Sequence, residues 1–278
     1  MDDFATIILS HGRANRVLTL EALSRARYGG KIYIVIDDED KEADSYRELY
    51  GDRVVQFSKK EAARITDMAD NKPERNVVCF ARNKVYDLAR GLGLRYIWVL
   101  DDDYTVFGTK ATDGERMYAH DVFIKDINPY INIALRFLKE SGSDCVAFAQ
   151  TGDFIGGVDS IKHFVKRKIM NSFFFDVQKP VTFYGRINED LTASVMGGLR
   201  GRLFWTLMPV ILRQQQTQKQ EGGLTEAYLS LGTYVKSMYS VLYAPSCVKL
   251  MAMGNKFKRI HHKVNWNRCC PKILREQR

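Results

Sequence analysis

Three consecutive aspartates at positions 101–103 directly follow the apolar run YIWVL at 96–100. Adjacent carboxylates repel one another, and ionised groups at the end of a strand need water, hydrogen bonds or a cation to compensate them. In a D-x-D at a strand end, the first and third carboxylates can face the same side, which suits a hard divalent cation that also binds water and substrate phosphates. The pattern predicts a metal site formed by Asp101 and Asp103, although short acidic triplets also occur without a metal.

Polar residues also follow two earlier apolar runs. The segment SHGR at 10–13 follows the first run, and DDED at 37–40 follows the second. Ligands of open α/β sheets bind at the carboxyl ends of the strands, so we expect these segments and the aspartate triplet to converge on one crevice. Neither GxGxxG nor GxxxxGK[ST] follows any of these runs, which argues against a dinucleotide-binding or P-loop protein.

The elements that would position these residues alternate between strand and helix. Short β-rich runs at 4–10, 31–36, 54–57 and 96–100 are predicted strands, and helices are predicted after residue 17 and at 46–50, 58–69 and 77–90. Almost continuously apolar strands that alternate with helices predict an α/β fold with a mainly parallel central sheet covered on both faces.

The second half of the chain is less regular. A helix is predicted at 127–139, a strand at 145–150 and a helix at 188–195, while GDFIGG at 152–157 and the aromatic stretch at 172–185 suggest hairpins. The glutamine-rich segment 214–223 is predicted to be a loop within the domain. No composition shift marks a boundary, so we expect one domain over 1–278.

Composition and charge narrow the class of protein. The chain has 278 residues and 42 Lys+Arg against 33 Asp+Glu, a formal net charge of +9 that favours polyanionic partners. No apolar run reaches the roughly 18 residues of a membrane span, and the N-terminus carries acids where a signal peptide carries bases, so we expect a soluble, cytoplasmic protein. Five cysteines without a CxxC argue against a disulfide framework or a zinc site.

Basic residues gather at the C-terminal end. Segment 256–278 contains eight Lys or Arg and one acid, Glu276, with histidines and a tryptophan interleaved. A solvated tail is one interpretation of such a run. The other is a nucleic-acid contact, for which the candidates are Lys256, Lys258, Arg259, Lys263 and Trp266.

The order of several motifs resembles that of a known group of enzymes. HGRAN at 11–15, IDD at 36–38, FARNKVYDLA at 80–89 and LDDD at 100–103 resemble the nucleotide-sugar glycosyltransferases of GT-A fold, and NED at 188–190 resembles the catalytic-base motif of their inverting members. The resemblance covers roughly residues 5–195. The FFFD and FYGRINEDLTAS block and the basic end with two histidines more specifically resemble the TET-associated glycosyltransferases, a phage-encoded group linked to sugar transfer onto hydroxymethylpyrimidines in DNA.

The resemblance implies an activity and its cofactors. We expect a metal-dependent, inverting hexosyl- or pentosyltransferase that uses Mn²⁺ or Mg²⁺ and a UDP-sugar, with UDP-glucose as the family-level choice, and that acts on 5-hydroxymethylcytosine in DNA. Residues 1–108 would then hold the nucleotide-sugar, residues 109–255 the acceptor, and 256–278 would form the basic C-terminal segment.

The resemblance also implies roles for individual residues. Asp103 would bind the metal beside the diphosphate, Asp101 would meet the ribose or a metal-bound water, and Asp102 would be outward or structural. For the catalytic base, Asp190 is the first candidate and Glu189 its competitor. A C-terminal histidine, His261 or His262, would add a metal ligand, and the remaining donor contacts would come from His11, Arg13, Asp37, Asp38 and Arg82, with Asp102 as a further candidate.

Other interpretations remain open. A nucleotidyltransferase of the same fold also uses carboxylates and a metal, but its usual glycine- and lysine-rich first loop is replaced here by HGRAN. The acceptor could be a saccharide or protein, or the chain could be a catalytically inactive nucleic-acid-binding module. A flipped base could stack on Phe173–Phe175 and Tyr184, although an aromatic-rich hairpin is more often part of a core.

Overall fold

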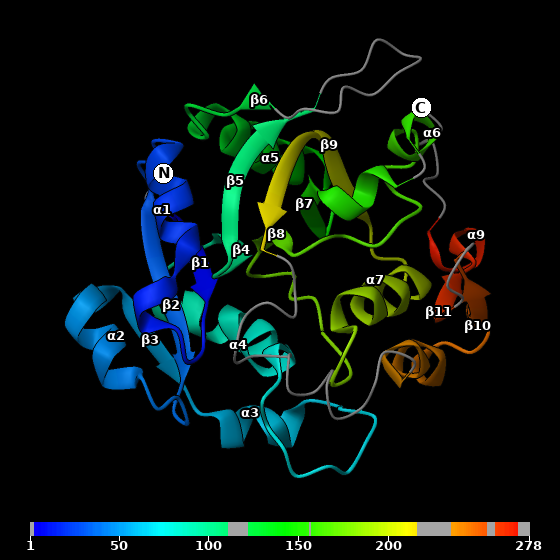
Figure 1. The fold of residues 1–278 in the computed structure, drawn as a ribbon, viewed down its shortest axis with the longest axis horizontal. Coiled ribbons are helices and arrows are strands. Elements are labelled where there is room, and N and C mark those ends of the chain that lie inside the picture. The colour runs from blue at the N-terminus through cyan, green and yellow to red at the C-terminus, as the bar shows by residue number, and fades with distance from the viewer. Residues whose placement is uncertain (1–2, 111–121, 156, 216–234, 255–258, 272–278) are drawn as a thin grey trace.

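A computed structural model describes residues 3–110, 122–155, 157–215, 235–254 and 259–271. Its first half alternates strand and helix as expected (Figure 1). Strands β1 (Phe4–Leu9), β2 (Lys31–Asp37), β3 (Val54–Phe57) and β4 (Tyr96–Asp101) pair in parallel in the order β3-β2-β1-β4. They are connected through α1 (Leu18–Arg25), α2 (Ala43–Tyr50), α3 (Lys59–Ile65) and α4 (Val78–Gly91), with short 3-10 turns at η1 (Ala14–Arg16) and η2 (Gly51–Arg53).

Among the described residues, the second half extends the same sheet to nine strands, in the order β3-β2-β1-β4-β8-β7-β9-β5-β6. Its strands are β5 (Tyr104–Thr109), β6 (Val122–Phe123), β7 (Cys145–Gln150), β8 (Ser172–Asp176) and β9 (Phe204–Gln214). Its helices are α5 (Asn128–Ser141), α6 (Val158–Ile161) and α7 (Glu189–Leu199), with a 3-10 turn at η3 (Thr151–Phe154). Pairing within this half is mixed, because β8 is antiparallel to both β4 and β7, whereas β7 and β9 are parallel.

The predicted hairpins at 152–157 and 172–185 are wrong. GDF forms most of the turn η3, and the aromatic stretch supplies the single central strand β8. Phe173, Phe174 and Phe175 are each at most 1% exposed, and Phe174 stacks on Trp98 with ring centroids 5.1 Å apart. A strand inserted between two others buries both of its faces, so these three phenylalanines form core and offer no platform for a base.

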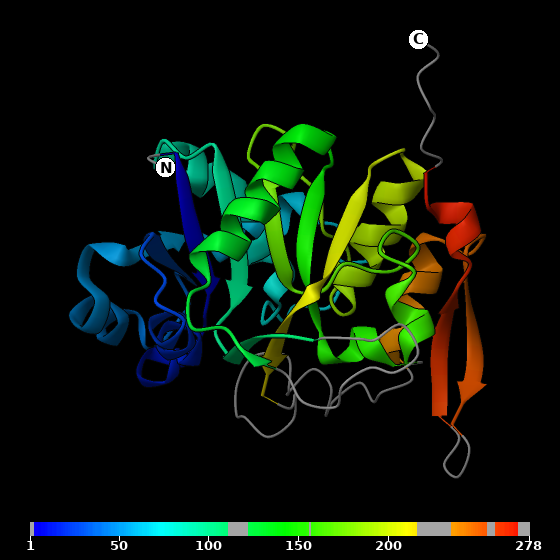
Figure 2. The ribbon, with the colours of Figure 1, turned by 90° about the horizontal axis from the view of Figure 1, so that it is seen from above.

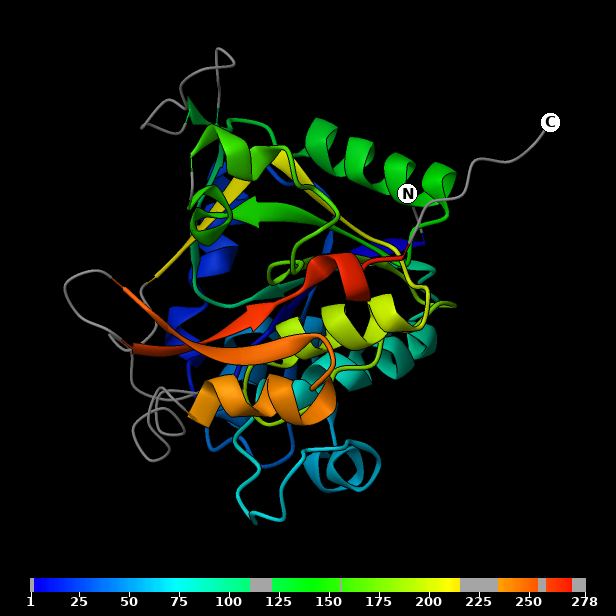
Figure 3. The same ribbon diagram turned by 90° about the vertical axis from the view of Figure 1, so that its right-hand side faces the viewer.

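The core lies in two layers, one on each face of the sheet. Alternate residues of each strand enter opposite layers: Ile8, Trp98 and Leu100 join one cluster, and Ile7 and Val99 join the other. Figure 3 shows α5 on one side of the sheet and α4 with α7 on the other. The α/β class with a helix-covered central sheet is confirmed.

A small C-terminal unit packs against α7. It consists of a helical segment at 235–243, the two-stranded antiparallel ribbon β10 (Val248–Met253) and β11 (Arg259–Val264), and α9 (Trp266–Cys269). Leu191 and Val195 of α7 share an apolar cluster with Cys247 and Val248 of this unit. Figure 2 shows the ribbon at the end of the molecule opposite α2.

Glycine is required where α9 meets α7. A Cβ at Gly198 would lie 1.8 Å from the carbonyl oxygen of Cys269, so any side chain would push the two elements apart. The contact therefore fixes the C-terminal unit closely against the helix that begins with Glu189. In the part of the chain described, no helix is both long and apolar enough to cross a membrane.

Candidate active site

Polar side chains meet at one edge of the sheet. Parallel strands β1, β2 and β4 end there, and Leu9 pairs with Asp101 in the register of β1 and β4. The end of β9 and the start of β5 reach the same edge, because Gln214 pairs with Tyr104 directly after Asp103. This convergence agrees with the expectation from the sequence and brings together Ser10, Asp37, Asp101, Asp103 and Gln214.

Asp101 and Asp103 face the same side. The amide Nε2 of Gln214 donates to Asp103 Oδ1 at 2.7 Å and to Asp101 Oδ2 at 3.3 Å. Asn171, directly before β8, donates from Nδ2 to Asp101 Oδ2 at 2.9 Å. The first and third carboxylates of the triplet thus point to a shared space, as predicted for a D-x-D.

Asp102 points the other way. It is 4% exposed, accepts a hydrogen bond from Ser10 Oγ at 2.6 Å and pairs with Arg13 Nη1 at 2.8 Å. Burial raises its pKa in spite of the neighbouring guanidinium. Of the two alternatives for Asp102, outward or structural, the contacts favour the structural one, because this carboxylate ties the loop after β1 to the end of β4.

The chemistry of this donor set fits a divalent cation. Burial and the carboxylates of Asp101 and Asp102 raise the pKa of Asp103 to about 7, so negative charge at this position is under-compensated by the protein itself. Asn171 Oδ1 is buried with no hydrogen-bond partner among the described residues. Carboxylate and amide oxygens are the ligands of Mg²⁺ and Mn²⁺, and Mg²⁺ sites often combine one or two carboxylates with water and substrate phosphates.

Ion pairs and hydrogen bonds connect the loop after β1 to the loop after β2. His11 Nδ1 lies 2.8 Å from Asp37 Oδ2, and Lys59 Nζ lies 2.9 Å from Asp37 Oδ1. Burial disfavours the charged form of Asp37, but the hydrogen bonds from His11 and Lys59 outweigh it and lower its pKa. The exposed Asp38 accepts from the backbone N–H of Lys59 at 2.8 Å, and Asp40 accepts from that of Gly12 at 2.9 Å.

A buried arginine connects the aspartate triplet to α7. Arg82 of α4 is 2% exposed, and its Nη2 lies 3.2 Å from Asp101 Oδ1 while its Nη1 pairs with Glu189. Its guanidinium carbon lies 5.3 Å and 5.6 Å from the ring centroids of Phe173 and Phe183. That Arg82 faces the donor stays a prediction, and its guanidinium contacts Asp101.

The two candidate bases at the start of α7 have different partners. Asp190 Oδ2 accepts from Lys168 Nζ at 2.6 Å, whereas Glu189 pairs with Arg82. Burial opposes ionisation of Asp190, but Lys168 and Arg82 outweigh it and lower its pKa to about 2. Burial raises the pKa of Glu189. Asp190 is therefore the carboxylate that remains firmly ionised.

The two histidines predicted as metal ligands, His261 and His262, lie on β11 beside α7. His262 Nδ1 lies 3.2 Å from Asn188 Nδ2, and His261 Nδ1 lies 2.9 Å from the backbone oxygen of His262. Within the described ranges, no three His, Cys, Asp or Glu side chains gather in a way that could hold a metal, so a histidine ligand stays a prediction. β11 packs beside α7, and His262 faces the start of that helix. Burial lowers the pKa of His262 to about 4, which keeps it neutral there.

The predicted nucleic-acid residues are only partly described. Lys256 and Lys258 lie outside the described residues, and Arg259 begins β11. Lys263 is exposed on β11, and Trp266 is half-buried at the start of α9. Tyr184 is half-buried, packs on Tyr243 with ring centroids 5.6 Å apart and accepts a hydrogen bond from Arg200.

Reasoning from the sequence missed Lys59, Lys168, Asn171 and Gln214. None of them belongs to a recognisable motif, and each reaches the site only through the fold. Two weak signals existed, since Asn171 directly precedes the aromatic block and Gln214 begins the glutamine-rich segment.

Comparison with known proteins identifies the family. A search of curated proteins found no significant match. Among solved structures, glucosyl-3-phosphoglycerate synthase from Mycobacterium tuberculosis in complex with Mn²⁺ and UDP-glucose is similar, with a TM-score of 0.50, 8% identity and coverage of 94% of this chain and 86% of that one. The same enzyme in complex with Mg²⁺ and UDP gives a TM-score of 0.49 at 9% identity, covering 94% of this chain and 87% of that one.

At 8% identity the likeness to the complex with Mn²⁺ and UDP-glucose concerns the fold alone, and it agrees with the predicted GT-A architecture. The family assignment rests on a different comparison. The family model for TET-associated glycosyltransferases matches residues 4–223, which include the aspartate triplet, Arg82 and the start of α7. The chain therefore belongs to the TET-associated glycosyltransferase family.

Proposed function

We propose that this glycosyltransferase moves glucose from UDP-glucose to the hydroxyl of 5-hydroxymethylcytosine in DNA, with inversion and with Mn²⁺ or Mg²⁺. The observation that carries the proposal is the arrangement of Asp101 and Asp103 on one side of the sheet edge, connected through Arg82 to the ionised start of α7. The family name supports a DNA acceptor, and the similar synthase was solved with Mn²⁺ and UDP-glucose.

At the donor end, Asp101 and Asp103 would hold the cation, with the buried oxygen of Asn171 as a further candidate. When bound, the cation would neutralise the charge that builds on the leaving diphosphate. The protein's part is to align the two carboxylates, which Gln214 does by donating to both.

The nucleoside would lie against the loops after β1 and β2. Asp37 pairs with both His11 and Lys59, and Asp38 accepts from the backbone N–H of Lys59. Arg13 pairs with Asp102, which joins the loop after β1 to the end of β4. Paired groups of this kind hold a binding loop in one conformation before the donor arrives, which lowers the entropic cost of binding.

At the acceptor end, Asp190 would take the proton from the incoming hydroxyl at Oδ2. Its lowered pKa keeps it deprotonated, and Glu189 is already occupied by Arg82. A base must lie within hydrogen-bond distance of the proton that it removes. The acceptor hydroxyl would therefore bind at Asp190 Oδ2, beside the ammonium group of Lys168. Transfer would proceed with inversion if the acceptor hydroxyl, activated by this base, attacked from the side opposite the leaving group.

We further propose that both halves of the chain work as one unit, with residues 1–108 on the donor and 109–255 on the acceptor. A single sheet contains strands of both halves, since β8, β7 and β9 lie beside β4. The basic segment 256–278 would contribute to binding the acceptor.

Mass spectrometry of DNA tests the proposed function. Hydroxymethylcytosine-containing duplex is incubated with the enzyme, Mn²⁺ and a panel of sugar nucleotides, beside unmodified duplex and a reaction with excess chelator. We expect one hexose per hydroxymethylcytosine with UDP-glucose and none in either control. Transfer to saccharides or proteins but not to DNA would identify a different acceptor, and no turnover of any donor would indicate an inactive binding module.

A further inference from the structure

A cavity of about 590 Å³ lies between the β10–β11 ribbon, α9 and the segment after α6. Its volume falls in the usual range of ligand pockets, roughly 300–1,000 Å³. None of the residues gathered at the edge of the sheet (Ser10, Asp37, Asp101, Asp103 and Gln214) lines it. The side chains around it include four exposed cations, an exposed histidine and a half-buried indole: Lys166, Lys249, Lys263, Arg268, His163 and Trp266.

Among the described residues, no carboxylate balances the positive charge of this pocket. No acidic residue lines it, and no ion pair joins Lys166, Lys249 or Lys263 to a carboxylate in the described part of the chain. Arg268 is held in place by donating from Nη1 to the backbone oxygen of Ser246 at 3.1 Å. A fixed guanidinium among unpaired ammonium groups is suited to phosphate oxygens.

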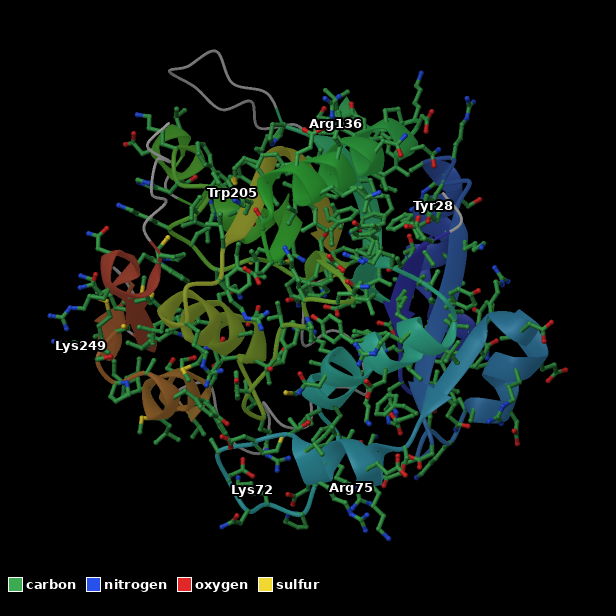
Figure 4. All side chains as sticks on the ribbon, turned by 180° about the vertical axis from the view of Figure 1, so that it is seen from behind. Tyr28, Lys72, Arg75, Arg136, Trp205 and Lys249 are labelled. Carbon is green, nitrogen blue, oxygen red and sulfur yellow. The ribbon has the colours of Figure 1, made fainter. Side chains whose placement is uncertain are left out.

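The register of the ribbon adds a second observation. Lys249 and Lys263 are direct cross-strand partners in the antiparallel pair. Side chains of such partners have Cβ atoms about 4.5–5.5 Å apart, and like charges at this position destabilise a sheet. Two lysines that face one another beside two further cations repel one another unless an anion lies between them. Figure 4 shows Lys249 at the outer edge of the molecule, on the side opposite Tyr28.

The pocket borders the candidate base. Lys166 lines the pocket, and two residues further on Lys168 pairs with Asp190. Two residues span at most about 7 Å of backbone, so the wall of the pocket lies close to the start of α7. On β11, Lys263 lines the pocket while its neighbour His262 contacts Asn188 on the other side of the ribbon. The pocket therefore shares β11 and the segment after α6 with the surroundings of the candidate base.

We propose that this pocket binds phosphodiester groups of the nucleic acid whose base is modified, and so holds the strand while the target hydroxyl reaches α7. The inference rests on the proposed function, because it assigns the anion to the acceptor. Phosphodiesters of DNA fit better than a free anion, since several cations spread along a ribbon match a chain of phosphates more closely than a single one. The pocket adds three residues to the candidate nucleic-acid contacts. Lys166 and Lys249 lie outside the basic C-terminal segment, and Arg268 lies within it.

Fluorescence anisotropy with a labelled duplex oligonucleotide tests the pocket without any turnover. We compare the wild type with the double variant Lys249→Ala and Lys263→Ala, and with the control Lys72→Ala and Lys125→Ala, which removes the same charge from exposed lysines outside the pocket. Each lost phosphate contact lowers the salt slope by about 0.9, so the pocket variant should lose about 1.8 in slope and on the order of 10–100-fold in affinity near 0.1 M salt. The control should lose less than about threefold.

Activity assays separate the pocket from the proposed reaction. If the wild type glucosylates DNA, the pocket variant should lose transfer to DNA at limiting substrate while transfer to the free hydroxymethyl nucleoside stays within about twofold, because nothing at the donor edge has changed. Equal DNA affinity in the wild type and the pocket variant would overturn the proposal that the pocket binds DNA, even where the wild type is active. Failure of the wild type to modify DNA, with pocket-dependent binding retained, overturns only the proposed reaction.

Two further probes exclude other sources of phosphate. Inorganic phosphate at millimolar concentration should compete only weakly with the duplex, and binding to phosphatidylserine vesicles should not depend on Lys249 and Lys263. Tight competition by free phosphate would identify a small-anion site, and vesicle binding that requires both lysines would identify a lipid surface. Either result would overturn the assignment to nucleic acid.

Discussion

Replacing Arg82 by methionine should destabilise the protein by about 3–5 kcal/mol. Methionine keeps much of the volume of the arginine stem but removes the charge between Asp101 and Glu189. Breaking a buried ion pair by removing one member is costly, because the other charge stays buried without compensation. Arg82 and Glu189 are only 2% and 4% exposed, so water cannot replace the lost partner.

The distances in the structure support this magnitude. At an effective dielectric constant of about 20, the 3.2 Å between Arg82 Nη2 and Asp101 Oδ1 corresponds to an attraction of about 5 kcal/mol. The ion pair with Glu189 adds to this attraction, while the desolvation cost of Arg82 itself is no longer incurred in the variant. The net loss should therefore fall near the range measured for broken buried pairs.

Urea unfolding at neutral pH measures the effect, with unchanged m-values as the condition for comparing free energies. The informative control is the double variant Arg82→Met with Glu189→Leu, which removes both members of the buried pair. Replacing a buried ion pair by apolar residues of similar volume is often neutral, so the double variant should recover at least half of the loss.

The dependence on pH provides an independent check. Burial already raises the pKa of Glu189 against the attraction of Arg82, and the variant Arg82→Met should raise it further. Above the ordinary glutamate pKa of about 4.3, the folded variant then holds a proton that the unfolded chain releases, so its free energy of unfolding falls as pH rises through the raised pKa. The deficit relative to the wild type should be smaller near pH 5 than near pH 8. A loss below about 1 kcal/mol, or a deficit independent of pH, would refute the reasoning.

Three further predictions concern the reaction and the C-terminal unit. In calorimetry, Asp103→Ala should abolish Mn²⁺-dependent binding of UDP-glucose, whereas Asp102→Ala should retain a substantial part of it. The reason is that the carboxylate of Asp103 faces the same side as that of Asp101, while Asp102 faces Ser10. Equal loss in the two variants would contradict this prediction. Asp190→Asn should lower transfer by roughly 10²–10⁴-fold with little change in donor affinity, while Lys168→Met should raise the pKa of Asp190 from about 2 and move the acid limb of the rate profile to higher pH. Gly198→Ala should cost roughly 1–3 kcal/mol in urea unfolding, because its Cβ would lie 1.8 Å from a backbone oxygen of α9; an unchanged midpoint would show that the two elements separate freely.

Local patterns in the sequence were enough to predict the first half of the fold. Each run at 4–10, 31–36, 54–57 and 96–100 became a strand, because apolar periodicity and flanking turn residues are local signals. The convergence of Asp37 with Asp101 and Asp103 followed from the rule that parallel strands share their carboxyl edge. Only the identity of the partners, such as Lys59 and Gln214, was out of reach.

The second half was harder because its strands pair across long stretches of chain. The aromatic stretch at 172–176 has the composition of a strand, but nothing local indicates that it inserts between β4 and β7. The hairpin prediction assumed that neighbours in sequence pair with one another, and a central position buried Phe173–Phe175 instead. The same limit applies to His262, whose partner Asn188 lies 74 residues away in the sequence.

The adjacent carboxylates of the NED motif show how the fold separates residues that a sequence treats alike. Glu189 and Asp190 are both buried in the first turn of α7, and from type and position either could accept a proton. Successive helical residues point about 100° apart, so one reaches Arg82 and the other reaches Lys168. Their pKa values move in opposite directions as a result, upward for Glu189 and downward for Asp190. Two carboxylates whose environments shift their pKa values in opposite directions often have different roles in an active site. Here Glu189 would connect α7 through Arg82 to Asp101, while Asp190 stays ionised for the acceptor.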